Sequence, residues 1–281
     1  MLPILSILEV LLTINHTIMN KILLSLFFLL SFFISKAQIF GYGFLNVPED
    51  EIQNFIQNEE EFFSKVAQEA IKNEHMTGWS IWRRVEGSAN EPNFYWYVGL
   101  GEFDNFTKFN ENYPAAYQKV LNKTGVPGLV ERALEKHSSY HTFTGTYYRG
   151  GMARNKKRGD LKYLKANYAK VENPQAFMQK QNEVWKPFIE KNMNNGKAKQ
   201  ELWATSMRIN PSGNGYNWNV MTIDAHSSIG DLYNPFDGKW EELNPPSQKE
   251  LSETNPKNGW YKTTIWERVL WIDNDGNLMK N

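Results

Sequence analysis

Hydrophobic positions along the first half of the chain follow two periods in turn. Apolar residues from 52 to 71 recur every three or four positions after the helix-start signal Asn46 and Pro48, which predicts an amphipathic helix. Shorter runs rich in aromatic and β-branched residues predict strands, two of them joined as a hairpin. A second helical stretch is expected to be broken at Pro114, Gly125 and Pro127. The predicted order is strand, helix, two strands, helix and strand, at residues 39–47, 52–71, 77–86, 93–100, 104–134 and 138–149.

The second half of the chain repeats this order. Asn173 and Pro174 give a helix start, and Gly196 gives the corresponding helix end. The linker between the halves, residues 150–160, carries a basic run that is typical of a solvated loop. The elements predicted here are a strand at 161–171, a helix at 174–194, strands at 201–210 and 216–225, a short helix at 247–255 and a strand at 261–273.

Individual residues also recur between the two halves. One constant spacing relates Val47, Trp79 and Arg84 to Val171, Trp203 and Arg208. The same spacing relates the run 57–59 to the run 181–183, both of which read Gln-Asn-Glu. The spacing then shortens by two residues, and Trp96 matches Trp218. A repeat of this kind indicates two copies of one supersecondary unit.

Each copy has the element order of a ferredoxin-like α+β unit, whose sheet leaves one face in need of cover. We therefore expect two such units, residues 38–150 and 151–281, to pack face to face. On its element order and repetition, the chain resembles the dimeric α/β-barrel superfamily with both halves fused, over residues 39–273. The resemblance implies a pseudo-dimeric α/β barrel. That superfamily includes haem-degrading and cofactor-free monooxygenases, haem peroxidases, chlorite-dismutase-like proteins and small isomerases, and the residues match no single one of these families.

The first 37 residues read as a secretory signal peptide. Lys21 precedes the apolar run 22–34, and Ser35 and Ala37 supply the small residues of a cleavage site. The true start is expected at Met19. The alternative is an uncleaved anchor, because the apolar N-terminal stretch is long enough to span a bilayer. The signal predicts an exported protein, in the periplasm or outside the cell, with no stable membrane insertion after cleavage.

Composition excludes several kinds of function. The chain has no cysteine, which removes disulfides, thiol catalysis and cysteine metal sites. Its 31 basic and 31 acidic residues balance to a formal net charge of +0, so we expect no nucleic-acid partner, which would need a basic face. Aromatic residues make up 14% of the chain, and their concentration in the predicted strands favours an apolar pocket.

Three residues are candidates for catalysis. His141, in the fourth predicted strand, would serve as a base or a haem ligand if it faced a barrel lumen. Its alternative role is that of a hydrogen-bonded structural histidine. Asp224 and His226 lie two positions apart on one strand face, and a carboxylate that orients a histidine is an arrangement used for general-base catalysis. Their alternative is a fraying strand end with Asp224 capping a turn. No metal site is predicted.

Two arginines and four tryptophans are candidates for ligand binding. Arg84 and Arg208 would hold a carboxylate at the two ends of a lumen, or else form surface ion pairs. Four tryptophans lie on predicted strands, where they would line an apolar cavity or pack between sheets: Trp82, Trp96, Trp218 and Trp266.

Three functions fit this pattern. The leading one is an exported barrel that binds a small apolar or aromatic molecule in its lumen. The second is an oxygenase-like or haem-dependent enzyme, for which haem would be the cofactor. The third is a structural component of the cell envelope with a filled barrel. A histidine among lumen aromatics would favour the enzyme, and a lumen packed by tryptophans would favour the structural role. We expect a monomer with pseudo-two-fold symmetry or a homodimer.

Overall fold

The computed structural model describes residues 38–86, 91–124, 135–155, 160–213 and 215–281, which belong to one compact unit. The predicted signal peptide, residues 1–37, lies outside these ranges, as do residues 156–159 of the predicted linker and residues 125–134 of the predicted helix 104–134. Within the described ranges, no helix is long and apolar enough to cross a membrane.

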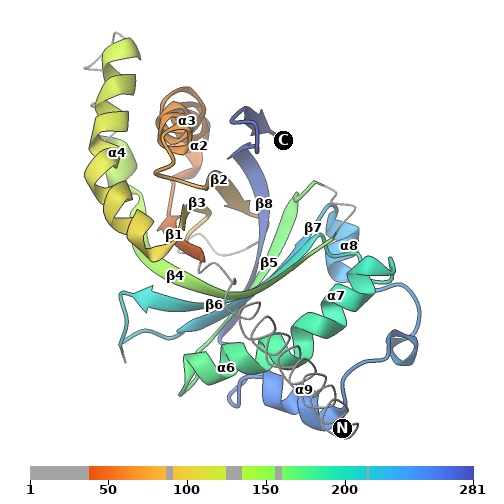
Figure 1. Cartoon of the computed structure of the whole chain (residues 1–281). Helices are drawn as coiled ribbons and strands as arrows, with labels where there is room; N and C mark the ends of the chain where they lie inside the picture. The colour runs from red at the N-terminus through yellow and green to blue at the C-terminus, as the bar shows by residue number, and fades with distance from the viewer. Residues whose placement is uncertain (1–37, 87–90, 125–134, 156–159, 214) are drawn as a thin grey trace, which may run out of the picture. The chain divides into compact units, whose positions relative to one another are not determined.

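The strands form one antiparallel sheet that closes on itself. Its order is β2-β3-β1-β4-β6-β7-β5-β8-β9, and β2 also pairs with β8. The first eight strands of this order therefore make a closed barrel, to which β9 is added at the edge of β8 (Figure 1). The strands are β1 (Gln38–Leu45), β2 (Gly78–Arg84), β3 (Phe94–Gly101), β4 (His141–Arg154), β5 (Tyr163–Ala169), β6 (Leu202–Asn210), β7 (Val220–His226), β8 (Lys262–Ile272) and β9 (Leu278–Lys280).

The helices pack on the outside of the barrel. Those of the first half, α2 to α4, lie on one side, and α6, α7 and α9 lie on the other (Figure 1). In each half the first helix contains a π-helical turn, η2 or η3. The helical elements are η1 (Glu49–Glu51), α2 (Ile52–Asn58), η2 (Glu59–Phe63), α3 (Ser64–Lys72), α4 (Phe103–Thr124), α6 (Pro174–Lys180), η3 (Gln181–Trp185), α7 (Lys186–Asn194), α8 (Ile229–Tyr233), η4 (Trp240–Leu243) and α9 (Gln248–Thr254).

The predicted fold class is wrong. It was two ferredoxin-like units packed face to face as a fused pseudo-dimeric α/β barrel. The two halves share one continuous sheet, because β4 pairs with β6 and β2 pairs with β8. These pairings join the strand edges that separate units would leave open. Closure by backbone hydrogen bonds, and not the stacking of one sheet on another, is what holds the halves together.

The internal repeat is confirmed at some positions and wrong at others. Arg84 and Arg208 are equivalent, since each donates its backbone N–H to the carbonyl of an asparagine, Asn93 or Asn219. The match of Trp96 with Trp218 is wrong. Trp96 lies inside β3, whereas Trp218 precedes β7.

The equivalent asparagines Asn93 and Asn219 make the same hydrogen bonds, each within its own half of the chain. Asn93 accepts the backbone N–H of Val47 at 2.9 Å and donates to its carbonyl at 2.7 Å, and Asn219 makes the same two bonds with Val171. We expect Asn93→Ala to lower the free energy of unfolding by about 1–3 kcal/mol, because both polar groups of buried Val47 lose their partner.

This expectation is measured by urea unfolding. Asn219→Ala should show a loss of the same size, and Asn217→Ala serves as a control, since that side chain is exposed and bonds only the exposed Tyr261. Equal stabilities for Asn93→Ala and Asn217→Ala would contradict a structural role for the two hydrogen bonds between Asn93 and Val47.

Most predicted elements are present, with different bounds. Helix α4 runs through Pro114, which is exposed, so the carbonyl that loses its helical partner can reach water. Strand β4 continues to Arg154, five residues into the predicted linker, and pairs there with β6. The elements α8, η4 and β9 were not predicted.

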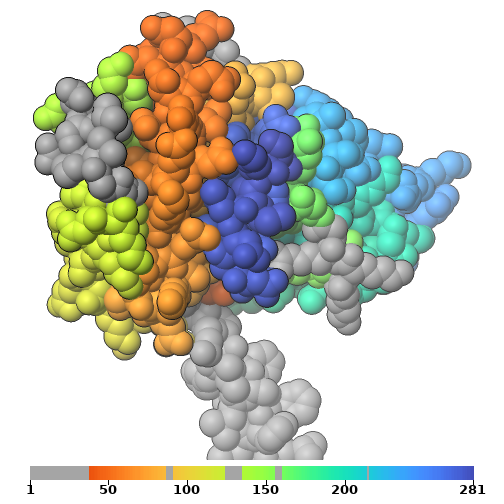
Figure 2. All heavy atoms as spheres, turned by 90° about the horizontal axis from the view of Figure 1, so that it is seen from above, coloured from red at the N-terminus to blue at the C-terminus, as the bar shows by residue number. Residues whose placement is uncertain are grey.

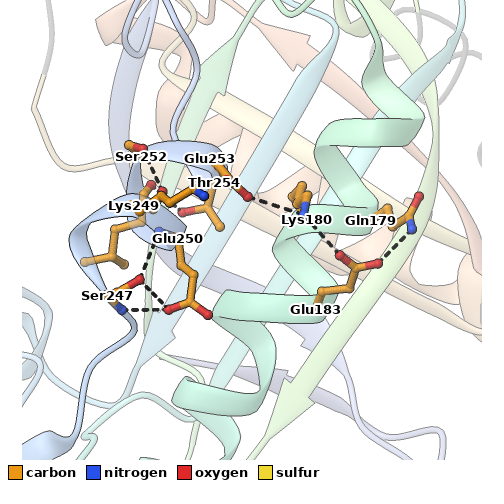
Figure 3. A network of polar contacts seen from close by, with 10 residues as sticks. Gln179, Lys180, Glu183, Ser247, Lys249, Glu250, Ser252, Glu253 and Thr254 are labelled. Carbon is orange, nitrogen blue, oxygen red and sulfur yellow. Dashed lines mark hydrogen bonds and ion pairs between the residues drawn. The ribbon is translucent and has the colours of Figure 1, made fainter.

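Helices and strand ends are tied to the barrel by polar contacts. In Figure 3, Lys180 lies between Glu183 at 3.5 Å and Glu253 at 3.3 Å, which links the first helix of the second half to α9. Ser247 and Glu250 form a capping box at the start of α9. The C-terminal segment, dark blue in Figure 2, lies beside the orange helices, where Lys280 bonds Glu60 at 2.8 Å.

Candidate functional site

The centre of the barrel is filled by side chains. Its inward-facing residues form one cluster of mainly aromatic rings, and between them there is no room for a water molecule. Eight strands enclose a space that side chains can just fill, so this packing is expected for the strand number. The buried members are Phe40, Tyr42, Phe44, Trp82, Tyr95, Tyr147, Leu164, Ala166, Tyr168, Ala204, Met221, Ile223 and Trp266.

A cavity of about 560 Å³ opens at the end of the barrel where β2 begins. We call it the Arg149 cavity. Its floor is made of the filled centre, from which Tyr42, Trp82 and Tyr95 contribute. Among the described residues, its walls also hold three arginines and two aspartates, an excess of one positive charge: Arg149, Arg154, Arg268, Asp160 and Asp273.

Arg149 is held in this cavity by aromatic rings and neutral acceptors. Its guanidinium carbon lies 4.8 Å from the centre of the Phe40 ring. Nη1 donates to Gln38 Oε1 at 2.8 Å, and Nη2 approaches the Tyr97 hydroxyl at 3.3 Å. Nε is buried and has no hydrogen-bond partner among the described residues. Within that part of the chain, no carboxylate lies at ion-pair distance from Arg149.

Arg268 occupies the equivalent place in the second half. Tyr147 faces Phe40 across β4 and β1, Trp266 faces Leu164 across β8 and β5, and each arginine follows two residues later. Arg268 also stacks on an aromatic ring, with its guanidinium carbon 3.6 Å from the centre of Trp271. Unlike Arg149, it forms an ion pair, with Asp160.

The tyrosines of the floor stay protonated. Burial raises the pKa of Tyr42 far above its usual value, although the nearby Arg149 charge opposes the shift. Burial raises the pKa of Tyr95 in the same way. Neither phenol therefore supplies an anion that would neutralise the arginines at neutral pH.

The opposite end of the barrel has smaller hollows on either side of Trp218. One of about 200 Å³ is lined by Arg84 and Trp266 among others, and one of about 490 Å³ is lined by Arg208. Arg208 is buried with its guanidinium carbon 3.9 Å from the centre of the Trp218 ring. Arg84 is paired with Glu91 at 3.0 Å. The two arginines thus flank one end of the barrel, and the expectation that they lie at opposite ends is wrong.

The three residues predicted for catalysis do not face the lumen. His141 pairs with Leu45 of the outer core and lies 5.3 Å, ring to ring, from His137 under the helices of the first half. Asp224 and His226 share one face of β7, as predicted, but Ile223 and Ala225 are the β7 residues that face the Arg149 cavity. Among the described residues, no hydrogen bond joins Asp224 to His226.

Burial shifts the pKa of each of these groups towards its uncharged form. It lowers the pKa of His141 to about 4, with help from the charge of His137, and lowers the pKa of His226 to about 4. Burial raises the pKa of Asp224 to about 6, while Lys165 and a hydrogen bond from Gln200 oppose the shift. A desolvated carboxyl and a desolvated imidazole without a shared hydrogen bond do not form an orienting pair.

Three of the four predicted tryptophans belong to the lumen cluster. Trp82 and Trp266 are buried in it, and Trp218 packs against it, with its ring stacked on Tyr147 at 5.5 Å. Trp96 instead faces outward over Gly43, where a Cβ would meet its ring at 2.2 Å. Sequence reasoning missed Arg149 and Arg268, whose signal was a shared position two residues after a large aromatic residue on the last strand of each half.

The described histidines do not fit a haem in the barrel. None of the residues lining the Arg149 cavity or the hollows beside Trp218 is a histidine. His141, the histidine predicted as a haem ligand, lies outside the lumen, under the helices of the first half. Within the described ranges, no group of three or more metal-ligating side chains is placed to hold a metal ion.

Comparison with known proteins identifies the fold and no single family. No family model and no curated protein matches this chain. A candidate monooxygenase from Fusobacterium nucleatum subsp. nucleatum superposes with a TM-score of 0.50 at 12% identity, over 88% of this chain and 99% of that one. One from Lactobacillus acidophilus gives 0.49 at 12% identity, over 87% and 96%. A chlorite dismutase variant from Candidatus Nitrospira defluvii gives 0.42 at 7%, over 83% and 91%.

The Fusobacterium nucleatum structure shares its fold with this chain. At such low identity the likeness extends to the fold alone. Function has to be argued from the residues of this chain.

Proposed function

We propose that this protein binds a small molecule with an aromatic or apolar body in the Arg149 cavity. The observation that carries the proposal is a cavity of about 560 Å³ above buried aromatic rings, at the end of a lumen that is otherwise filled. Its volume and its mixture of rings with a few polar groups are those of sites that enclose small ligands. We also propose that binding takes place outside the cytoplasm, as the predicted signal peptide indicates.

The two alternative functions have less support. An oxygenase-like or haem-dependent enzyme is suggested by the fold, but its candidate groups His141, Asp224 and His226 lie away from the cavities. A purely structural barrel agrees with the filled centre. It does not account for a hollow lined by three arginines at one end.

Calorimetric titration with two probes of equal size, 2-naphthoate and 2-naphthamide, tests the proposal. We expect saturable one-to-one binding of at least one probe. Ala204→Met should abolish it, because Ala204 lines the cavity and is buried, so a longer side chain takes up ligand volume. Tyr261→Ala, which alters only the hollow at the opposite end, is the matched control and should bind as the unmodified protein does.

Flat titrations with both probes would overturn the proposed function. Binding that survives Ala204→Met but is lost in Tyr261→Ala would place the site at the other end of the barrel and would equally overturn it.

A further inference from the structure

We propose that the ligand of the Arg149 cavity is an acid with a single negative charge on an aromatic or alicyclic body, bound through its carboxylate to Arg149. This inference rests on the function proposed above and adds the chemical class of the ligand. The argument depends on the difference between two equivalent arginines in one cavity.

In the part of the chain that the structure describes, Arg149 is a cation without a counter-ion. Its hydrogen-bonding partners, Gln38, Tyr97 and Met152, are all neutral. Removing a guanidinium from water without pairing it is unfavourable, and an anion that enters the cavity and pairs with it recovers part of that cost. Nε is buried and has no partner among the described residues, so hydrogen bonds compensate the burial of this group only in part.

Aromatic contacts fix the plane of this guanidinium. Phe40 lies 4.8 Å from its carbon and Tyr97 lies 6.0 Å from it, measured to the ring centres. A ring that covers the flat face of an arginine leaves the N–H groups along its edge, and those groups match the two oxygens of a carboxylate. The ring contacts therefore orient Arg149 for bidentate binding.

Arg268 limits the ligand to one charge. It stacks on Trp271 as Arg149 does on Phe40, but Asp160 already neutralises it. Asp273 is the second carboxylate of the lining, whose described residues include three arginines and two aspartates. One positive charge remains, so a dianion would leave one of its charges unpaired. The aromatic floor of Tyr42, Trp82 and Tyr95 suits the ring system of the acid.

The test compares 2-naphthoate with 2-naphthamide at pH 7, which differ in charge and hardly in shape. We expect the unmodified protein to bind the naphthoate about tenfold or more tightly than the amide. Arg149→Gln should lower naphthoate affinity by about tenfold or more and leave naphthamide affinity within about twofold. Retained amide binding shows that the variant is folded.

Two further variants test whether the carboxylate of the ligand binds at Arg149. Arg149→Lys keeps the charge but loses the flat fork, and it should fall between Arg149→Gln and the unmodified protein. Arg84→Gln changes an arginine at the opposite end of the barrel and should leave both affinities unchanged.

The outcomes separate this inference from the proposed function. Equal affinities for the two probes would overturn the inference that the ligand is an acid, and would leave the proposed binding of an aromatic molecule in place. A larger loss for Arg268→Gln than for Arg149→Gln would overturn Arg149 as the anchor. Failure of both probes to bind would overturn the proposed function itself.

Discussion

Trp266→Ala is expected to lower the free energy of unfolding by about 3–5 kcal/mol, the largest single effect in this barrel. Trp266 is 1% exposed, and its ring lies 4.7 Å from Tyr95 and 6.1 Å from Phe44. Its Nε1 donates to Thr264 Oγ1 at 2.6 Å. A closed sheet cannot contract around a missing ring, because its strand number fixes its diameter, so the cavity left by the substitution should remain open.

Two further variants calibrate this loss in urea unfolding. Trp266→Phe keeps most of the ring contact but loses the hydrogen bond, and we expect a loss of about 1–2 kcal/mol. Tyr261→Ala removes an aromatic ring that is 55% exposed and should change stability by less than about 1 kcal/mol. A Trp266→Ala protein as stable as Tyr261→Ala would contradict a packed lumen.

Local pattern was enough to place most of the elements. Helix 174–194 was bounded by Asn173 and Gly196, and the structure has α6, η3 and α7 over that range. Closure of the barrel was beyond such reasoning. It depends on β4 meeting β6 and β2 meeting β8, and periodicity along one strand does not specify which other strand pairs with it.

His141 shows how a small irregularity changes the role of a residue. His141 and Phe143 are two positions apart, so an even strand would place both in the lumen. A register shift between Phe44 and Leu45 puts His141 opposite Leu45, in the outer core, while Phe143 stays against the lumen cluster. A one-residue bulge reverses the face of a side chain and leaves no clear sequence signal.

The prediction of a catalytic pair at Asp224 and His226 on β7 was wrong for a different reason. Alternation correctly placed Asp224 and His226 on one face, but it does not tell which face is inside. Both faces of β7 are buried, one by the lumen and one by the outer elements, so hydrophobicity could not decide between them. Arg149 was overlooked because a charged residue at the end of a predicted strand is most often a solvated one.

The buried groups of β7 also predict how stability depends on pH. His226 has a pKa of about 4 in the folded protein against 6.5 as its ordinary value, so the unfolded chain binds its proton first as pH falls. The stability that comes from keeping His226 neutral is complete above pH 6.5 and is lost between there and pH 4. Between pH 7 and pH 4.5 this loss amounts to about 2 kcal/mol.

Asp224 acts in the opposite direction over nearly the same range. Its pKa of about 6 in the folded protein exceeds the ordinary 3.8, so the folded protein binds its proton first as pH falls. Its contribution to stability is complete below pH 3.8 and is lost as pH rises towards 6. From pH 7 down to pH 4.5, Asp224 therefore adds about 2 kcal/mol of stability, which offsets most of the loss at His226.

Substituting either residue should reveal the pH dependence of the free energy of unfolding that comes from the other. Relative to the unmodified protein, His226→Gln is expected to gain about 2 kcal/mol between pH 7 and pH 4.5, and Asp224→Asn to lose about as much. Urea unfolding at the two pH values measures both, and any loss that does not depend on pH cancels in the comparison. Tyr261→Phe, which carries no group that titrates in this range, should follow the unmodified protein. Parallel pH profiles for all four proteins would mean that neither group is desolvated, and β7 would then not be covered on its outer face.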